Sequence, residues 1–356
     1  MAQREMQEVV IASAARTPIG AFQGSLSTVS ACTLGSVAIS AAVKRAGLSP
    51  DDVDEVYMGS VLQAGLRQGP CKQAALSAGL PTTVPATTIN KLCASGMKAI
   101  MMAAQNLMCG HQSVMVAGGM ESMSNVPYYI KRGVTPYGGF TAEDGLLFDS
   151  LQDPHSGIHM GEFSEHTASR LDISREEQDE FAIRSYQLSQ EAASNGVFQK
   201  EIAKVPVPQR KGEYIFVSED EEYKKFNKDK MKTLRTVFKK EGDFVDAATD
   251  PINFTIAPAL AIRKLLARCG VKAEDVSMWE INEAFSAVVL ACLKELNLST
   301  DRVNIHGGAV SIGHPLGMSG ARITGHMAHT LEKDQYGVAA ICNGGGGASA
   351  IIIQGL

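Results

Sequence analysis

The pattern of apolar and polar positions in this chain occurs twice. Residues 41–62 and 264–285 each predict an amphipathic helix, a glycine at its C-terminal end, an acidic turn and then a buried strand. The two glycines, Gly47 and Gly270, are 223 positions apart. Each stretch is therefore expected to be a helix–turn–strand segment of one shared design.

Two further matches have nearly the same offset. Residues 95–107 match residues 319–331 at an offset of 224, and Gly118 matches Gly344 at an offset of 226. Repetition at one spacing predicts a duplicated α/β unit. The predicted strands are apolar throughout, which favours burial on both faces of a largely parallel sheet.

The two units are expected to differ at their start. The first opens with "EVVIASAARTPIG" (8–20), which predicts a strand. The repeat places the corresponding strand of the second unit near residues 230–240, "KMKTLRTVFKK", which are too charged for a buried strand. We therefore expect the second unit to lack its opening strand.

The chain between the two units is more polar. Residues 125–242 are polar and contain charge runs such as "SEDEEYKKFNKDKMK" (218–232). A helix is predicted over residues 174–196, with Ser174 as its N-cap and Gly196 at its end. We interpret residues 125–242 as an inserted loop domain over two core domains, residues 1–124 and 243–356. A solvated surface excursion is the alternative.

Composition narrows the class of protein. The chain has 356 residues, a formal net charge of −5 and an ordinary globular balance, so its whole surface does not attract nucleic acid or anionic membranes. No apolar run reaches the ~18–20 residues that a membrane span needs. The first ten residues resemble neither a signal peptide nor a transit peptide. Seven unclustered cysteines predict reduced thiols and no zinc site.

Cys93 is the first candidate for chemistry, in "INKLCASGMKAIMMAAQNLMCG" (89–110). The pattern places this thiol where a helix begins. The positive end of the helix dipole and its free N–H groups are expected to lower the pKa of the thiol and favour the thiolate. The alternative is a small buried apolar residue.

Further candidates follow predicted buried strands or precede helices. Cys342 precedes a run of glycines whose N–H groups are suited to an oxyanion hole, His314 is a candidate base, and Asn282 with Glu283 ends an apolar strand. Strand termini and loop or helix caps are the alternatives. Because equivalent strand ends of a duplicated fold meet near its pseudo-twofold axis, we expect these groups to meet Cys93. Two thiols, a base and an amide fit acyl transfer through a thioester.

The motifs "NKLCASGMKAI", "VAGGMESMSN", "NEAF", "GGAVSIGHPLGMSGAR" and "CNGGGGASA" together resemble the thiolase family over nearly the whole chain. The biosynthetic mitochondrial type is the most similar. The resemblance implies the α/β thiolase fold, with duplicated core domains in αβαβα layers and an inserted loop domain. It also implies a homodimer or homotetramer in mitochondria, with the cytoplasm as alternative, and a place in ketone-body, fatty-acid and isoleucine metabolism.

The resemblance implies a mechanism with no tightly bound cofactor. Cys93 would attack acetyl-CoA and hold the acetyl group, after activation by His314. His314, with a water held by Asn282, would polarise the thioester oxygen, and Cys342 would remove the α-proton of a second acetyl-CoA. The N–H groups of Cys93 and Gly344 would form a second oxyanion hole. The products would be acetoacetyl-CoA and CoA.

The resemblance also implies how substrate and ions bind. The residues expected near CoA are Tyr186, Lys225, Asn227 and Lys230 at the nucleotide, and His159 and Met160 at the pantetheine and acyl groups. Members with "TPYGG" (135–139) also accept 2-methylacetoacetyl-CoA and respond to potassium. Tyr186 and the carbonyl of Val310 match two of their potassium contacts.

One departure from the family lies after "RTVFKKEG" (235–242), where its members carry a longer segment with core strands. A catalytically impaired, thiolase-like CoA-binding protein is therefore an alternative. A ketoacyl synthase is a second one. Cys342 argues against it, because those enzymes use histidine at that place.

Overall fold

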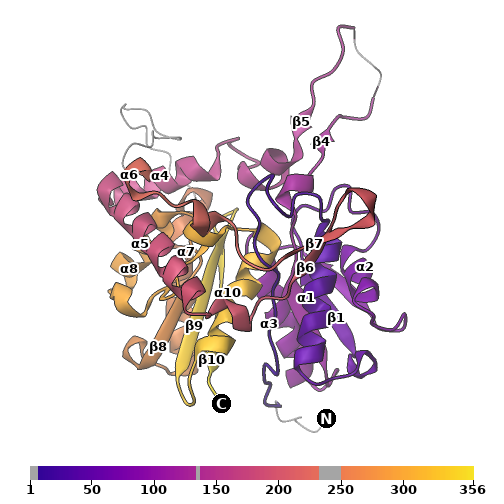
Figure 1. Cartoon of the computed structure of the whole chain (residues 1–356). Coiled ribbons are helices and arrows are strands. Elements are labelled where there is room, and N and C mark those ends of the chain that lie inside the picture. The colour runs from indigo at the N-terminus through magenta and orange to yellow at the C-terminus, as the bar shows by residue number, and fades with distance from the viewer. Residues whose placement is uncertain (1–6, 134–136, 232–249) are drawn as a thin grey trace.

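The computed structural model describes residues 7–133, 137–231 and 250–356. The predicted domain boundary at residue 242, most of the segment 230–240 and the start of "TPYGG" lie outside these residues. Figure 1 shows two α/β halves side by side, the first on the right and the second on the left, with the inserted region above them.

The first half contains a parallel sheet of order β2-β1-β3. Val56 in β1 lies opposite Ala86 in β2 and Val116 in β3. The elements of this half, in chain order, are α1 (Ala31–Arg45), η1 (Pro50–Asp52), β1 (Glu55–Gly59), α2 (Pro70–Ser77), β2 (Ala86–Ile89), α3 (Ser95–Met108) and β3 (Met115–Gly119).

The second half contains a sheet of order β10-β9-β8, in which β8 and β9 are parallel and β10 is antiparallel to β9. Trp279 in β8 lies opposite Val338 in β9. The elements are η7 (Asp250–Ile256), α7 (Ala257–Cys269), η8 (Ala273–Asp275), β8 (Val276–Ile281), α8 (Ser286–Leu296), η9 (Thr300–Arg302), α9 (Ala309–Ile312), α10 (Leu316–Thr330), β9 (Tyr336–Asn343) and β10 (Gly347–Gln354).

The helix–turn–strand repeat is present in both halves. Gly47 and Gly270 have φ of +73° and +67°, a left-handed conformation that favours glycine, and each is followed by a short 3₁₀ turn and a strand. The strand pairing corrects one of the three offsets between the two halves. Val116 in β3 and Val338 in β9 occupy equivalent places in their sheets, and they are 222 positions apart. The offset of 226, based on the glycine runs, was wrong.

Side chains along β9 point alternately to the two faces of the second sheet, and each face is covered by its own layer of helices. Val338 and Ala340 pack with α7 and α8, whereas Ala339 and Ile341 pack with α3 and α10. On the first sheet, α1 and α2 cover Val56 and Met58. The result is the expected αβαβα order, with α3 and α10 in the central layer (Figure 1).

Glycines allow the two central helices to approach closely. A Cβ on Gly320 of α10 would lie 2.7 Å from the backbone N of Met97 in α3. A Cβ on Gly96 of α3 would lie 2.8 Å from the carbonyl O of Gly317 and 3.0 Å from the N of Ala321. The two helices that the repeat made equivalent therefore cross with backbone against backbone.

The inserted region contains the predicted long helix, α5 (Arg175–Ser194). Ser174 caps it in a capping box with Glu177, and Gly196 has φ of +74°. A short 3₁₀ helix, η2 (Met123–Asn125), lies across the predicted boundary, and the other elements of the inserted region are β4 (Tyr128–Tyr129), β5 (Glu143–Asp144), the π-helix η3 (Leu147–Leu151), α4 (Met160–Arg170), η4 (Phe198–Lys200), β6 (Val205–Pro208), η5 (Arg210–Gly212), β7 (Tyr214–Val217), η6 (Glu222–Lys225) and α6 (Lys228–Met231). The β4–β5 hairpin projects away from the body in Figure 1.

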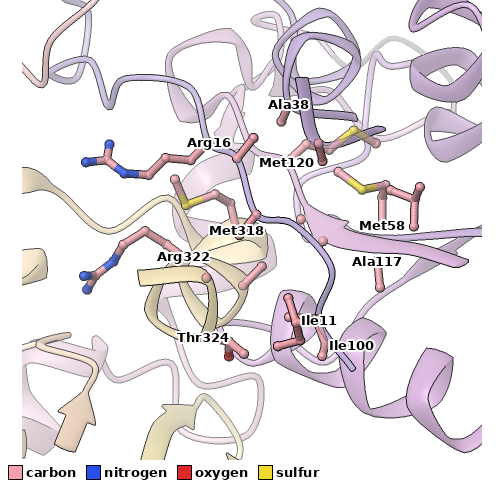
Figure 2. A pocket seen from close by; sticks show the side chains of 18 of the residues that line it. Ile11, Arg16, Ala38, Met58, Ile100, Ala117, Met120, Met318, Arg322 and Thr324 are labelled. Carbon is pink, nitrogen blue, oxygen red and sulfur yellow. The ribbon is translucent and has the colours of Figure 1, made fainter. Parts of the chain in front are cut away.

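The predicted opening strand at residues 8–20 is wrong. The described part of this segment contains only an isolated bridge, between Arg16 and Ile202, and the side chain of Val10 is 55% exposed. A cavity of about 1330 Å³ is lined both by this segment and by β3, so the segment is not paired with the edge of the sheet. Figure 2 shows Ile11, Arg16 and Ala117 among the residues that line this cavity.

A buried ionic cluster attaches the N-terminal segment to the rest of the molecule. Arg16 binds Asp220 at 2.6 Å and Glu201 at 3.3 Å, and His326 of α10 contacts Glu201 at 3.3 Å. His306 contacts His326 at 3.0 Å.

Among the described helices, none is long and apolar enough to cross a membrane.

Candidate active site

Cys93 lies in a tight turn between β2 and α3. Leu92 has φ of +48°, a conformation that non-glycine residues rarely adopt. The hydroxyl of Ser95 accepts a hydrogen bond from the N–H of Lys91 at 2.8 Å and donates to the carbonyl of Leu92 at 2.6 Å. This turn holds the half-buried Cys93 side chain just before the first turn of the helix.

The surroundings of Cys93 raise the pKa of its thiol to about 11. Burial is the largest cause. The N–H groups of Gly344 and of Cys93 itself hydrogen-bond to the sulfur and act in the opposite direction, and the charge of Glu121 raises the pKa further. The expected lowering of this pKa was wrong, because desolvation outweighs the amides. The resting thiol is therefore protonated at pH 7 and requires a base.

Cys342 lies at the end of β9 with no exposed surface. It packs with Met160 and Phe163 of the inserted region and with Phe254 and Val288. Burial raises the pKa of Cys342 well above its usual range, and the second cause is Cys93. The Cys93 and Cys342 thiols, one from each half, are therefore close enough for one to raise the pKa of the other.

The His314 ring is held from both sides. Its Nδ1 lies 2.6 Å from the hydroxyl of Ser319, which donates its own hydrogen to the carbonyl of Pro315 at 2.9 Å. Nδ1 must therefore carry the proton, and Nε2 keeps a lone pair, 3.5 Å from the amide nitrogen of Asn282. Burial lowers the pKa of His314 to about 4, so the ring is neutral at pH 7 and can accept a proton.

Asn282 follows β8 directly and is fully buried. Its backbone N–H donates to the carbonyl of Ala340 at 2.9 Å, but its side-chain oxygen has no hydrogen-bond partner within the described residues. Glu283, by contrast, is satisfied by Ser185 and Asn304 and holds the loop that leads to His314. A buried, unpaired amide oxygen beside His314 is suited to a water or a substrate.

Part of the set expected at the nucleotide comes together on one surface. Tyr186 of α5 stacks on Phe226 with ring centres 4.9 Å apart. Lys225 pairs with Glu222 at 3.0 Å, and the side chain of Asn227 accepts from the N–H of Lys230 at 3.0 Å. The sequence did not reveal that Lys225 forms ion pairs with Glu221 and Glu222.

His159 and Met160 lie at the start of α4. His159 caps the helix, with its Nδ1 accepting from the N–H of Gly161 at 3.0 Å. The sulfur of Met160 would lie 3.7 Å from a Cβ on Gly344, and Met160 packs in the same cluster as Cys342. The structure thus brings the start of α4 to the two cysteines.

Tyr186 and Val310, the residues expected at potassium, lie on adjoining helices, because their neighbours Ser185 and Ser311 are hydrogen-bonded at 3.0 Å. Hard cations are held by shells of about six or more oxygen ligands. Tyr186 and the carbonyl of Val310 would supply two of these oxygens. Within the described residues, no group of three or more His, Cys, Asp or Glu side chains is placed to hold a metal.

Sequence reasoning missed three residues that support the site. Ser319 sets the tautomer of His314, and Lys91 donates to the carbonyl of Ala348 and the hydroxyl of Ser349 in β10. Glu121 is a buried carboxylate directly after β3. The signal that identified Asn282, a polar residue at the end of an apolar strand, also applies to Glu121.

Family comparisons agree with this arrangement. The profile of the thiolase N-terminal domain matches residues 9–253, and that of the thiolase C-terminal domain matches residues 236–355. Among solved structures, a thiolase from Ascaris suum in complex with coenzyme A superposes with a TM-score of 0.93 at 40% identity, covering 98% of this chain and 100% of that one. The acetyl-CoA acetyltransferase of Bacillus anthracis has a TM-score of 0.92 at 36% identity, covering 99% of this chain and 100% of that one.

Relatives of similar length support the same assignment. The mitochondrial acetyl-CoA acetyltransferase of Xenopus tropicalis is 55% identical, covering 100% of this chain and 94% of that protein. The human mitochondrial protein of this name is 51% identical, covering 99% of this chain and 91% of that protein. The Xenopus alignment spans 394 positions, against 356 residues here, so about 38 positions of that relative have no counterpart. With both family profiles matched over nearly its whole length, the chain belongs to the thiolase family and has the thiolase fold.

Proposed function

We propose that this protein is an acetyl-CoA C-acetyltransferase, which reversibly condenses two molecules of acetyl-CoA to acetoacetyl-CoA and CoA. One observation carries the proposal. Cys93, from the first half, packs in the same cluster as Ile341, the neighbour of Cys342 in β9, and a Cβ on Gly344 would lie 3.1 Å from Leu92, the neighbour of Cys93. A nucleophile, a second thiol and oxyanion donors at one place suit acyl transfer.

The first step forms an acetyl-enzyme. The neutral His314 ring takes the proton of Cys93 at Nε2, and the sulfur attacks the carbonyl carbon of acetyl-CoA. The C–S bond to CoA then breaks, and the departing thiolate takes the proton of the Cys342 thiol, which leaves Cys342 as the thiolate for the second step. A base is needed here, because the pKa of the Cys93 thiol is about 11.

The second step forms the carbon–carbon bond. The thiolate of Cys342 removes the α-proton of a second acetyl-CoA, whose developing enolate oxygen is stabilised by His314 and by a water on Asn282. The carbanion attacks the acetyl group on Cys93, and the resulting oxyanion lies against the N–H groups of Cys93 and Gly344. Collapse breaks the bond to Cys93, whose sulfur takes its proton back from His314, and acetoacetyl-CoA is released.

The remaining assignments belong to the same proposal. Tyr186, Lys225, Asn227 and Lys230 bind the CoA nucleotide, and His159 and Met160 face the pantetheine and acyl groups. Core domains 1–124 and 243–356 carry the chemistry, and residues 125–242 bind CoA. The relatives' names support a mitochondrial location and leave the cytoplasm as the alternative. The protein acts as a homodimer or homotetramer, with Tyr186 and the carbonyl of Val310 as contacts of a potassium ion.

Thiolysis of acetoacetyl-CoA by the purified protein tests the function, with Cys93→Ala as the control. We expect turnover by the wild type and none by the variant, together with an acetylated Cys93 peptide when acetyl-CoA alone is supplied. A folded wild-type protein that binds CoA but neither turns over nor acetylates would favour the impaired CoA-binding alternative.

A further inference from the structure

Glu121 joins the two halves of the molecule beside the candidate site. Its side chain is 5% exposed and lies directly beyond β3. One carboxylate oxygen accepts from the N–H of Val61 at 3.0 Å and of Gly317 at 2.8 Å, and the other accepts from the N–H of Leu62 at 3.2 Å. Val61 and Leu62 follow β1, whereas Gly317 belongs to α10 of the second half.

The contact at Gly317 is closely fitted. A Cβ there would lie 2.8 Å from the carboxylate of Glu121, and the Gly317 carbonyl fits against Gly59, Gly96 and Gly119 of the first half. The backbone of Gly317 is therefore fixed on both its N–H and its C=O side. No side chain other than that of Glu121 is seen to accept from this N–H among the described residues.

Gly317 and Ser319 share the first turn of α10, and Ser319 sets the orientation and tautomer of His314 at 2.6 Å. A continuous series of contacts thus runs from Glu121 through Gly317 and Ser319 to the His314 ring. The second half has a different residue at the position equivalent to Glu121. The registers of β3 and β9 match Glu121 with Asn343.

We propose that Glu121 is a positioning residue for the acyl transfer described above: by holding the N–H of Gly317 it fixes the first turn of α10, and with it the ring of His314. The inference rests on the proposed function for its consequence in turnover. Its geometric core, that Glu121 fixes the position of the His314 ring through Gly317 and Ser319, does not require substrate.

The test compares Glu121→Gln with Asp54→Asn. Asp54 is a matched control, since its carboxylate accepts from the N–H groups of Ser113 and Val114 at the opposite end of β3. The rate at which iodoacetamide alkylates Cys93 is followed by mass spectrometry of its peptide. In Glu121→Gln we expect this rate and kcat for thiolysis to fall roughly 10- to 100-fold, with KM nearly unchanged. Asp54→Asn should match the wild type.

The sign of the alkylation change separates positioning from a simple charge effect. The negative charge of Glu121 raises the pKa of Cys93, so its loss alone would accelerate alkylation. A faster reaction in Glu121→Gln would overturn the proposal. So would an equal effect of Glu121→Gln in a His314→Ala background, where a residue acting through His314 has nothing left to position.

A folding failure of Glu121→Gln does not end the test. Glu121→Asp keeps the charge but is one methylene shorter, and it cannot reach Gly317 and both N–H groups after β1. Slowed alkylation in that variant supports the proposal, and wild-type alkylation with wild-type kcat contradicts it. If the wild-type enzyme itself shows no turnover, the proposed function fails, while the alkylation comparison still decides the role of Glu121.

Discussion

Strands β3 and β9 hold equivalent places in the two halves, yet their surroundings differ. β9 lies between β8 and β10, and its residues from Gly337 to Asn343 are all buried. Among the described strands, β3 is paired only with β1, and each of its residues is half-buried beside the large cavity. Figure 2 shows Met58 and Met120 at this cavity. The first half therefore has open space on the side where the second half has a strand.

The centre of the molecule does not share this difference. Both central helices cross at glycines, and both carry a candidate reacting group at or just before their first turn, Cys93 before α3 and His314 before α10. The comparison indicates that the site depends on the α3–α10 crossing more than on the outer edge of the first sheet.

The largest expected effect is on activity, and it differs between variants of Cys93 and Cys342. Cys93→Ala should lower thiolysis about 10⁴-fold or more, because the nucleophile is lost. Cys342→Ser should still acquire an acetyl group on Cys93 from acetyl-CoA but fail to condense. Mass spectrometry of the acetyl-enzyme and an assay of acetoacetyl-CoA formation distinguish the two. Unimpaired condensation by Cys342→Ser would refute its role as the base at the α-carbon.

The next effect concerns the helix crossing. Gly320→Val would place a Cβ 2.7 Å from the backbone of α3 and should lower the free energy of unfolding by about 3 kcal/mol or more. Gly325→Ala, on the same helix, meets only Ala14 at 3.3 Å and should be nearly neutral. Urea denaturation measures both. Equal midpoints for the two variants would contradict the close crossing.

A matched pair of alanines compares the two sheets directly. Ala339 in β9 is fully buried against α3 and α10, so Ala339→Ile should cost about 1–3 kcal/mol of stability. Ala117, at the equivalent place in β3, lines the cavity, and Ala117→Ile should be neutral or stabilise by about 0.5–1 kcal/mol. Chemical denaturation compares the two. A larger loss for Ala117→Ile would show that the space beside β3 is filled in solution.

The smallest expected effect is one of pH. Burial, and then His326, lowers the pKa of His306 to about 4, whereas an unfolded chain has a histidine pKa near 6.5. The unfolded chain therefore binds more protons below pH 6.5, so this contribution to stability is complete above pH 6.5 and is lost as the pH falls toward 4. Thermal melts at pH 7 and pH 5 should differ less in His306→Asn than in the wild type. If the melting temperature changes by the same amount between pH 7 and pH 5 in His306→Asn and in the wild type, the predicted contribution of His306 is refuted.

Local patterns predicted the repeated elements because their causes are local. The left-handed glycines Gly47 and Gly270 and the capping box of Ser174 depend on residues only a few positions away. The meeting of the two cysteines was also predictable, because duplication places equivalent strand ends together. The strand at residues 8–20 was not, since a strand exists only if its partner does.

Sequence motifs were thus sufficient for the family and the repeated helix–turn–strand elements, since these follow from residue type and spacing. The pKa of Cys93, the support of His314 by Ser319 and the contact between Glu121 and Gly317 required the folded chain. Desolvation and hydrogen-bond geometry arise from residues far apart in sequence, and no local pattern contains them.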